Sequence, residues 1–176
     1  MKRLYLLRHA KSSWGSPDLA DHERPLNQRG QDAAAAMGRH LAGWEQPPQA
    51  ILASTARRVV ETLAILRQAA GLKQAPILRD RGLYLAEPAA LLARLRLAPA
   101  EADSLLMVGH NPGIHDFALR MAGEISEANI DMRDRLRAGY PTCALTVFDF
   151  PKAASWREIG WGDGWLEDFV TPKQLG

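Results

Sequence analysis

Short apolar runs alternate with longer segments of helical periodicity along the chain. The β-rich runs predict strands, and apolar residues at three- and four-residue spacing predict helices. The expected strands cover residues 4–7, 50–53, 76–78, 104–108 and 144–150. The expected helices cover residues 28–44, 57–70 and 88–97, and a fourth helix begins at residue 113. A further strand is expected at 156–160, paired through a turn with 144–150.

This order of elements predicts an α/β fold. Strands that alternate with helices are joined by right-handed crossovers, which give a mostly parallel sheet with helices on both faces. The last two expected strands are close enough to form a hairpin, so one antiparallel edge strand is also expected. A length of 176 residues suits one domain. We therefore expect a single-domain three-layer sandwich over residues 1–176, without a separate lid domain.

Composition narrows the classes of function. Lys and Arg number 22 and Asp and Glu number 20, so the net charge of +2 favours neither nucleic-acid nor membrane binding. No apolar run approaches the ~20 residues of a membrane helix. Cys143 is the one cysteine, which excludes a disulfide framework and a thiolate metal cluster. We expect this thiol to be buried and inert, and the protein to be cytoplasmic.

Polar residues follow three of the expected strands. They are the pair Arg8-His9, the segment from Ser54 to Arg58 and the segment from His110 to Gly113. In sheets of this kind, ligands bind at the carboxyl ends of the strands. The shared position of the three segments therefore predicts a single site at one edge of the sheet.

The residue types in these segments indicate phosphoryl chemistry. Arginine grips phosphate with two parallel hydrogen bonds, and histidine acts as a nucleophile or proton carrier near neutral pH. Helix N-termini after Ser54 and Gly113 offer free N–H groups to an anion. The combination favours phosphoryl transfer through a covalent histidine intermediate. Metal binding by His9, His110 and His115 is the weaker alternative, since arginines repel a cation and these motifs lack carboxylates.

The motif Leu6-Leu7-Arg8-His9-Ala10 resembles the Arg-His-Gly signature of the histidine phosphatase, or phosphoglycerate mutase-like, superfamily. Ala10 replaces the usual glycine, as in the compact SixA-like branch of that superfamily. The resemblance covers nearly the whole chain. Its other segments are Arg24-Pro25-Leu26 with Gly30, Ser54 with Arg58 and Thr62 (Thr55 replacing proline), Leu83-Tyr84 followed by Leu91-Leu92, Val108 to Gly113, and Phe169 to Lys173.

This resemblance implies a cofactor-independent phosphatase that needs no metal and acts on a phosphorylated protein or a small phosphate. Its roles are a nucleophile, three residues that hold the phosphoryl oxygens, and further substrate-binding residues. By position, the resemblance implies that His9 is the nucleophile. It implies that Arg8, Arg58 and His110 hold the phosphoryl oxygens, and that Lys11, Ser54 and Asn111 bind the substrate. The SixA-like branch favours phosphohistidine of a protein as the substrate. The alternatives are a small-molecule phosphomonoesterase, a mutase, or a non-catalytic phosphate-binding module.

Two details follow from the residues themselves. His9 must be deprotonated to attack phosphorus, and neighbouring arginines favour this by lowering its pKa. Its other ring nitrogen is expected to donate to a backbone carbonyl. Arg57 and Arg58 point about 100° apart on a helix, so only one faces the pocket. The spacing of the motif that resembles the family, from Ser54 and to Thr62, favours Arg58.

The proton donor stays open at this stage. Asn111 stands where some superfamily members carry an aspartate, and larger members use a glutamate from an insert for which this chain has no room. Asp80 and Glu87 are the candidates, and Asp18, Asp21 and His22 have no assigned role. The stretch 160–165 is expected to be a tight loop whose tryptophans cover the core, or else an aromatic pocket wall.

Overall fold

A strand buried on both faces lies in the middle of the sheet. The computed structural model describes residues 1–123 and 129–176. Strand β1 (Lys2–Arg8) pairs in parallel with β4 (Ser104–Gly109) and antiparallel with β5 (Leu145–Phe150). Outward from these lie β2 (Ala50–Ala53) and β3 (Ile77–Arg79) on one side and β6 (Trp165–Val170) on the other. The order is β3-β2-β4-β1-β5-β6.

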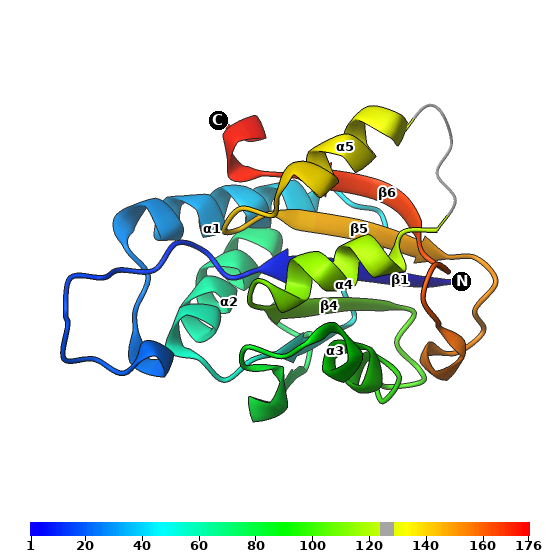
Figure 1. Ribbon diagram of the computed structural model, residues 1–176, viewed down its shortest axis with the longest axis horizontal. Helices are drawn as coiled ribbons and strands as arrows, with labels where there is room; N and C mark the ends of the chain where they lie inside the picture. The colour runs from blue at the N-terminus through cyan, green and yellow to red at the C-terminus, as the bar shows by residue number, and fades with distance from the viewer. Residues whose placement is uncertain (124–128) are drawn as a thin grey trace.

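Helices cover both faces of this sheet, as Figure 1 shows. Helices α1 (Gln28–Ala42) and α2 (Arg57–Ala70) pack together on one face. Helices α3 (Pro88–Leu95) and α4 (Gly113–Met121) lie on the other, and α5 (Ile130–Ala138) packs against α4 and β6. The mostly parallel α/β sheet with antiparallel pairing toward one edge is therefore confirmed. Among the described residues, no helix has the length and apolar character needed to cross a membrane.

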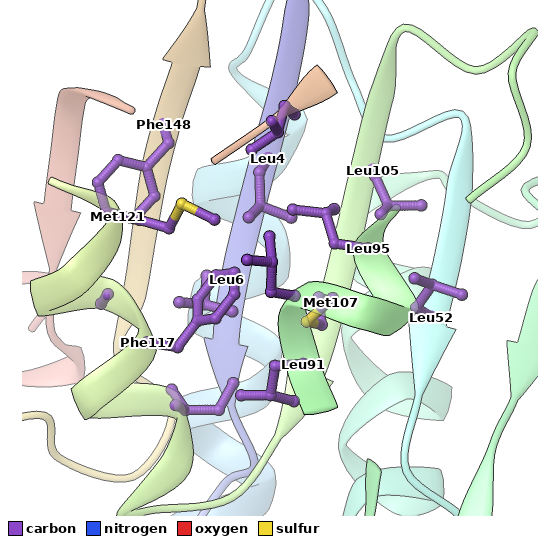
Figure 2. Close-up of a cluster of buried hydrophobic side chains, with 14 of the residues drawn as sticks. Leu4, Leu6, Leu52, Leu91, Leu95, Leu105, Met107, Phe117, Met121 and Phe148 are labelled. Carbon is purple, nitrogen blue, oxygen red and sulfur yellow. The ribbon is translucent and has the colours of Figure 1, made fainter. Parts of the chain in front are cut away.

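Successive side chains along β1 point alternately into two separate hydrophobic cores. Leu4 and Leu6 contribute to the core under α3 and α4, whereas Tyr5 and Leu7 contribute to the core under α1 and α2. Figure 2 shows Leu4 and Leu6 together with Leu91 of α3. All four β1 side chains are fully buried. The strand is thereby fixed in register, because a slip by one residue would exchange the two cores.

Local sequence signals set several helix ends. The side chain of Asn27 accepts a hydrogen bond from Gly30 N and caps α1. Pro88 occupies the first turn of α3, where its missing N–H costs nothing. Gly71 ends α2 with φ of +71°, a conformation that favours glycine. The bounds expected for α2 and β2 are confirmed to the residue, whereas α1 and α3 each end two residues early.

The strand expected at 156–160 is wrong. Trp156 to Glu158 form a short 3-10 turn instead, and β6 is the strand that pairs with β5. The turn forms because the buried Trp156 ring donates its Nε1–H to the carbonyl of Ala102, while the Glu158 carboxylate accepts from Ala154 N. Helix α5 was not expected, because only Leu136 in it is buried and its apolar pattern is weak.

Residues 160–164 form a loop that leads into β6 at Trp165, and Trp161 lies edge-on against the Phe117 ring in α4. Trp161 thus covers part of the core, as expected, whereas Trp165 is about half exposed on β6. Cys143 is buried as expected, and burial raises the pKa of its thiol to about 12. At neutral pH this cysteine is therefore an unreactive thiol.

Candidate active site

Two histidines lie side by side at the carboxyl ends of β1 and β4. The parallel register pairs Arg8 with Gly109, so the next residues, His9 and His110, leave the sheet together. Their ring centroids are 5.1 Å apart, and the residues are 7% and 2% exposed. The expected convergence of the first and fourth strands on one site is thus present in the fold.

Arg58 joins the two rings from the first turn of α2. The residue is only 3% exposed. Its Nε donates to His9 Nε2 at 3.3 Å, and its Nη2 donates to His110 Nδ1 at 3.2 Å. Because a guanidinium can only donate, both of these ring nitrogens are unprotonated acceptors. Arg57 points to solvent and pairs with Glu61 at 2.8 Å, so the choice of Arg58 as the inward-facing arginine is confirmed.

The proton of the His9 ring is held on the opposite nitrogen. Nδ1 lies 2.7 Å from the carbonyl oxygen of Ala10, which can only accept, so Nδ1 carries the hydrogen. Burial, together with the charges of Arg58, Arg8 and Arg24, lowers the pKa of His9 to about 4, against the raising effect of the Ala10 carbonyl. His9 is therefore neutral at physiological pH. The direction expected from the arginines is confirmed, although burial is the larger cause.

His110 is also neutral, but its ring is held differently. Its Nε2 lies 2.7 Å from Ser54 Oγ and donates to it, because Nδ1 already accepts from Arg58. Burial, together with His9 and the charge of Arg58, lowers the pKa of His110 to about 3, against the raising effect of Asp21. Ser54 Oγ also accepts from Ala56 N at 3.3 Å. Ser54 is thus positioned behind His110, where it orients that ring.

Arg8 and Asn111 meet at one backbone carbonyl. Arg8 Nη1 and Asn111 Nδ2 each donate to Tyr140 O at 2.9 Å. The buried Tyr140 hydroxyl donates in turn to Leu6 O and accepts from Thr146 Oγ1, which fixes this part of the chain. Within the described ranges, Arg8 Nε and Asn111 Oδ1 are buried without a hydrogen-bond partner. Arg8 therefore keeps one buried donor without a partner among the described residues.

Asp21, for which the sequence indicated no role, reaches into the site from the loop before α1. Arg58 donates to its backbone carbonyl at 2.6 Å and to its carboxylate at 3.0 Å. The carboxylate also accepts from the hydroxyl of Tyr84 and from Arg24 Nη1. These bonds, the one from Tyr84 first, hold the pKa of Asp21 far below its usual range. Asp21 is thus ionised and orients Arg58.

Sequence reasoning missed Asp21 and Tyr140 as site residues. The only signal for Asp21 was its place three residues before Arg24, in a loop without periodicity. Tyr84 was visible as part of the Leu83-Tyr84 pair but had no assigned role. Its ring lies edge-on to His110, with centroids 5.3 Å apart. These three residues surround the site from segments that carry no motif of their own.

Close backbone packing holds the loops of the site in place. Ala10 N donates to Thr62 Oγ1 at 3.0 Å, and the Thr62 hydroxyl donates to Arg58 O at 2.6 Å, which ties the loop after β1 to α2. A side chain at Gly113 would place its Cβ 1.8 Å from the carbonyl oxygen of Ala86. Only glycine therefore fits at the start of α4 beside His110.

Other expected site residues lie outside this cluster. Lys11 is exposed and lines a groove beside the site. Asp80 accepts from Gly82 N and from Arg94, and these bonds lower the pKa of its carboxyl group. Glu87 is exposed and precedes α3.

His115, the third histidine considered as a metal ligand, donates to Leu136 O on α5. In residues 1–123 and 129–176, no three His, Cys, Asp or Glu side chains are grouped to hold a metal ion.

A neutral histidine with a free ring nitrogen, next to a buried guanidinium, suits attack on an anionic phosphoryl group. The α/β sheet and this pair of histidines at its carboxyl edge indicate a phosphatase. Comparisons with known proteins agree. The model of the histidine phosphatase superfamily (branch 1) matches residues 4–84. The chain belongs to the histidine phosphatase superfamily, and its resemblance to the SixA-like branch is confirmed.

Three relatives illustrate this membership. The chain is 30% identical to a candidate phosphohistidine phosphatase SixA from Agrobacterium tumefaciens, with a TM-score of 0.77 over 97% of this chain and 98% of that one. A candidate SixA from Nakamurella multipartitia is 27% identical, with a TM-score of 0.79 over 97% and 96%. An uncharacterized protein of Mycobacterium leprae is 32% identical over 95% of this chain and all of its own.

Proposed function

We propose that this protein is a cofactor-independent phosphatase that works through a phosphohistidine at His9. The observation that carries the proposal is the orientation of the His9 ring. Its Nδ1–H is bound to the carbonyl of Ala10, and its unprotonated Nε2 faces Arg58 at 3.3 Å. A histidine in this state needs no base to remove a proton before it attacks.

The reaction has two displacements at phosphorus. In the first, the lone pair of His9 Nε2 forms a bond to phosphorus, and the bond to the leaving group breaks with its electron pair. The leaving group takes a proton from solvent. In the second, water forms a bond to phosphorus, the P–Nε2 bond breaks, and the electron pair returns to His9 while the water proton passes to solvent. Free phosphate then leaves the site.

The cationic side chains stabilise the phosphoryl group in both steps. Arg58 now donates to His9 Nε2, and a phosphoryl group bound at that nitrogen would bring its oxygens within reach of the same guanidinium. The buried Nε–H of Arg8 is a second donor. A phosphate dianion also favours the protonated form of His110, which then donates from Nδ1. Together these donors match the charge that develops in an in-line displacement.

Phosphohistidine of a protein is the substrate that this site suits best. An alkyl phosphate releases a poor alkoxide and needs a positioned acid. In this site Asp21 is ionised, Asp80 is bound to Arg94, and Glu87 is exposed outside the cluster. A phosphohistidine releases imidazole, which solvent protonates readily because its reference pKa is ~6.5.

A cytoplasmic place of action belongs to this proposal, since the lone thiol of Cys143 suits a reducing compartment.

The test compares kcat/KM for a phosphohistidine protein with that for phosphoserine and sugar phosphates. We expect kcat/KM to be about tenfold or more higher for the phosphohistidine protein. Alkyl phosphates lack general-acid assistance in this site, and such assistance is worth roughly 10²–10⁴-fold in rate. The His9→Ala variant is the inactive control for every substrate. The choice of substrate would be overturned if kcat/KM were about tenfold higher for alkyl phosphates and if Asp80→Asn or Glu87→Gln abolished that difference. No turnover of either the phosphohistidine protein or p-nitrophenyl phosphate would indicate a non-catalytic phosphate-binding module.

A further inference from the structure

A basic groove runs beside the site along α1. It encloses about 690 Å³, and its charged side chains come from the loop after β1, from α1 and from the turn after β6. The four cations are Lys11, Arg29, Arg39 and Lys173, and the one acidic side chain is Asp32. Even with a terminal carboxylate at Gly176, which also lines the groove, positive charges outnumber negative ones by four to two.

These four cations are not neutralised by the protein. All four side chains are exposed, and none pairs with a carboxylate within the part of the chain that the structure describes. Elsewhere on the surface, arginines do find partners, as in the pairs Arg57–Glu61 and Arg133–Asp134. A concave surface lined by one sign of charge concentrates ligands of the opposite sign. The groove therefore favours an anionic ligand.

One end of the groove lies beside the proposed active site. Lys11 is two residues after His9, so their Cα atoms lie within about 7 Å of each other. On the other wall, Thr142 is two residues after Tyr140, whose carbonyl binds Arg8. The wall at Lys11 is closely packed, since a Cβ at Gly30 would lie 2.2 Å from Lys11 O. One end of the groove therefore lies close to His9.

The groove has the length of a peptide segment. Arg29 and Arg39 are ten residues apart on α1, which corresponds to about 15 Å along the helix axis. Ala33 and Ala36 line the groove between them and leave room for a backbone to approach. A stretch of about 15 Å accommodates roughly four extended residues. A lone phosphate or a phosphorylated small molecule would contact only a part of this surface.

We propose that the basic groove binds an acidic polypeptide segment that flanks the phosphorylated histidine of the substrate protein. This inference rests on the proposed function, because it names the substrate surface that accompanies the phosphoryl group at His9. Lys11 contacts the residues nearest the phosphohistidine. Arg29, Arg39 and Lys173 bind carboxylates farther along the segment.

The test uses two phosphohistidine peptides that are identical except for glutamates or glutamines around the histidine, with p-nitrophenyl phosphate as the small substrate. The groove variant combines Arg29→Glu, Arg39→Glu and Lys173→Glu. The matched control combines Lys73→Glu, Lys152→Glu and Arg157→Glu. These three residues are also exposed, lie in connections near the amino ends of the parallel strands, opposite the site, and give the same change in net charge.

We expect the groove variant to lose about tenfold or more in kcat/KM for the glutamate peptide, mainly through KM, since three exposed charge contacts become repulsive. Its turnover of the glutamine peptide and of p-nitrophenyl phosphate should match that of the control variant. A peptide with lysines in place of glutamates should in turn be hydrolysed better by the groove variant than by the wild type. This reversal would show direct contact rather than a change in folding.

Several outcomes would overturn the inference. An equal loss in the control variant would mean that only net charge matters. If a short oligonucleotide competes as strongly as the unphosphorylated glutamate peptide, the groove binds any polyanion. If wild-type protein hydrolyses neither phosphohistidine nor p-nitrophenyl phosphate, the proposed function fails. Fluorescence anisotropy with a labelled glutamate peptide then still decides whether the groove binds acidic segments.

Discussion

His9 and His110 occupy equivalent positions at the ends of neighbouring parallel strands, yet the two rings carry their protons on different nitrogens. Both rings are buried, both are neutral and both accept a hydrogen bond from Arg58. His9 carries its proton on Nδ1, which donates to Ala10 O, whereas His110 carries its proton on Nε2, which donates to Ser54 Oγ. The free nitrogen is therefore Nε2 in His9 and Nδ1 in His110.

The partners of the two protons explain what each histidine can do. A backbone carbonyl can only accept, so the tautomer of His9 is fixed with Nε2 available for attack. The hydroxyl of Ser54 can either accept or donate, so it tolerates both tautomers of His110 as well as its charged form. The fixed ring suits a nucleophile, and the adaptable ring suits a group that gains a proton when phosphate binds. The following predictions test this division.

The largest effect is expected from exchanging the two histidines for alanine. His9→Ala should lose essentially all turnover because no other unprotonated nitrogen occupies its position. His110→Ala should lose roughly 10²–10³-fold, the usual cost of one charge-stabilising donor. Turnover of p-nitrophenyl phosphate measures both losses, and an acid quench with labelled substrate should trap a phosphoenzyme in the wild type. Undiminished phosphoenzyme in His9→Ala would assign the nucleophile to another residue.

The arginine between the two rings should come next. Arg58→Ala should lower kcat by roughly 10²–10³-fold, because both histidines lose their shared donor. Arg58→Lys should recover little, since a lysine cannot reproduce the planar fork that contacts both rings. Arg57→Ala is the neighbouring control and should stay within a few-fold of the wild type, because Arg57 faces solvent. A larger loss for Arg57→Ala would contradict the site described above.

A smaller effect is expected on stability at acid pH. The folded-state pKa values of about 4 for His9 and about 3 for His110 lie below the reference of 6.5. Between pH 6.5 and 4 the unfolded chain therefore binds protons that the folded chain does not, and stability falls as pH falls. Each histidine adds a slope of about 1.4 kcal/mol per pH unit.

Urea unfolding at a series of pH values measures this slope. His110→Gln should reduce it by the contribution of one histidine, whatever the variant does to stability at neutral pH. Gln31→Ala, an exposed change on α1 that removes no titratable group, is the control and should leave the slope as in the wild type. An unchanged slope in His110→Gln would mean that His110 is protonated in the folded protein.

The smallest expected effect is that of a chelator. A metal ion shared by His9 and His110 would need free nitrogens from both rings, but Arg58 donates to those nitrogens and would repel a cation. Activity should therefore be the same before and after EDTA, and vanadate should inhibit as a phosphate analogue. Loss of activity with EDTA that a divalent ion restores would contradict this prediction and remove the distinction between the two histidines.

The segment from residue 50 to residue 70 was the easiest part of the molecule to predict from sequence. The strand at 50–53 and the helix at 57–70 have unambiguous periodicity and end at proline and glycine signals, so their bounds agree with the structure. The convergence of Arg8, His9, Arg58 and His110 followed from the rule that parallel strands present their carboxyl ends at one edge. These features depend on local pattern and topology, which a sequence displays directly.

The features that escaped prediction depend on contacts between distant segments. Asp21 lies in an irregular loop, and its role becomes visible only when Arg58, Arg24 and Tyr84 surround its carboxylate. The turn at Trp156 resembled a strand, because nothing local shows that its ring donates to Ala102 O. Asp80 remained a candidate acid until its bond to Arg94 was known. In each case a tertiary hydrogen bond outweighed the local propensity.

The central place of β1 has a consequence for synthesis of the protein. Leu4 pairs with Leu105 on one side and with Phe148 on the other, so the strand that leaves the ribosome early finds both of its neighbours late. Pairings this distant in sequence slow folding, because a long loop must close before they form. The nascent chain therefore carries an apolar strand with two open edges, flanked by Lys2, Arg3 and Arg8, charges that discourage association with other chains. Its His9 and His110 come together only after β4 has been made.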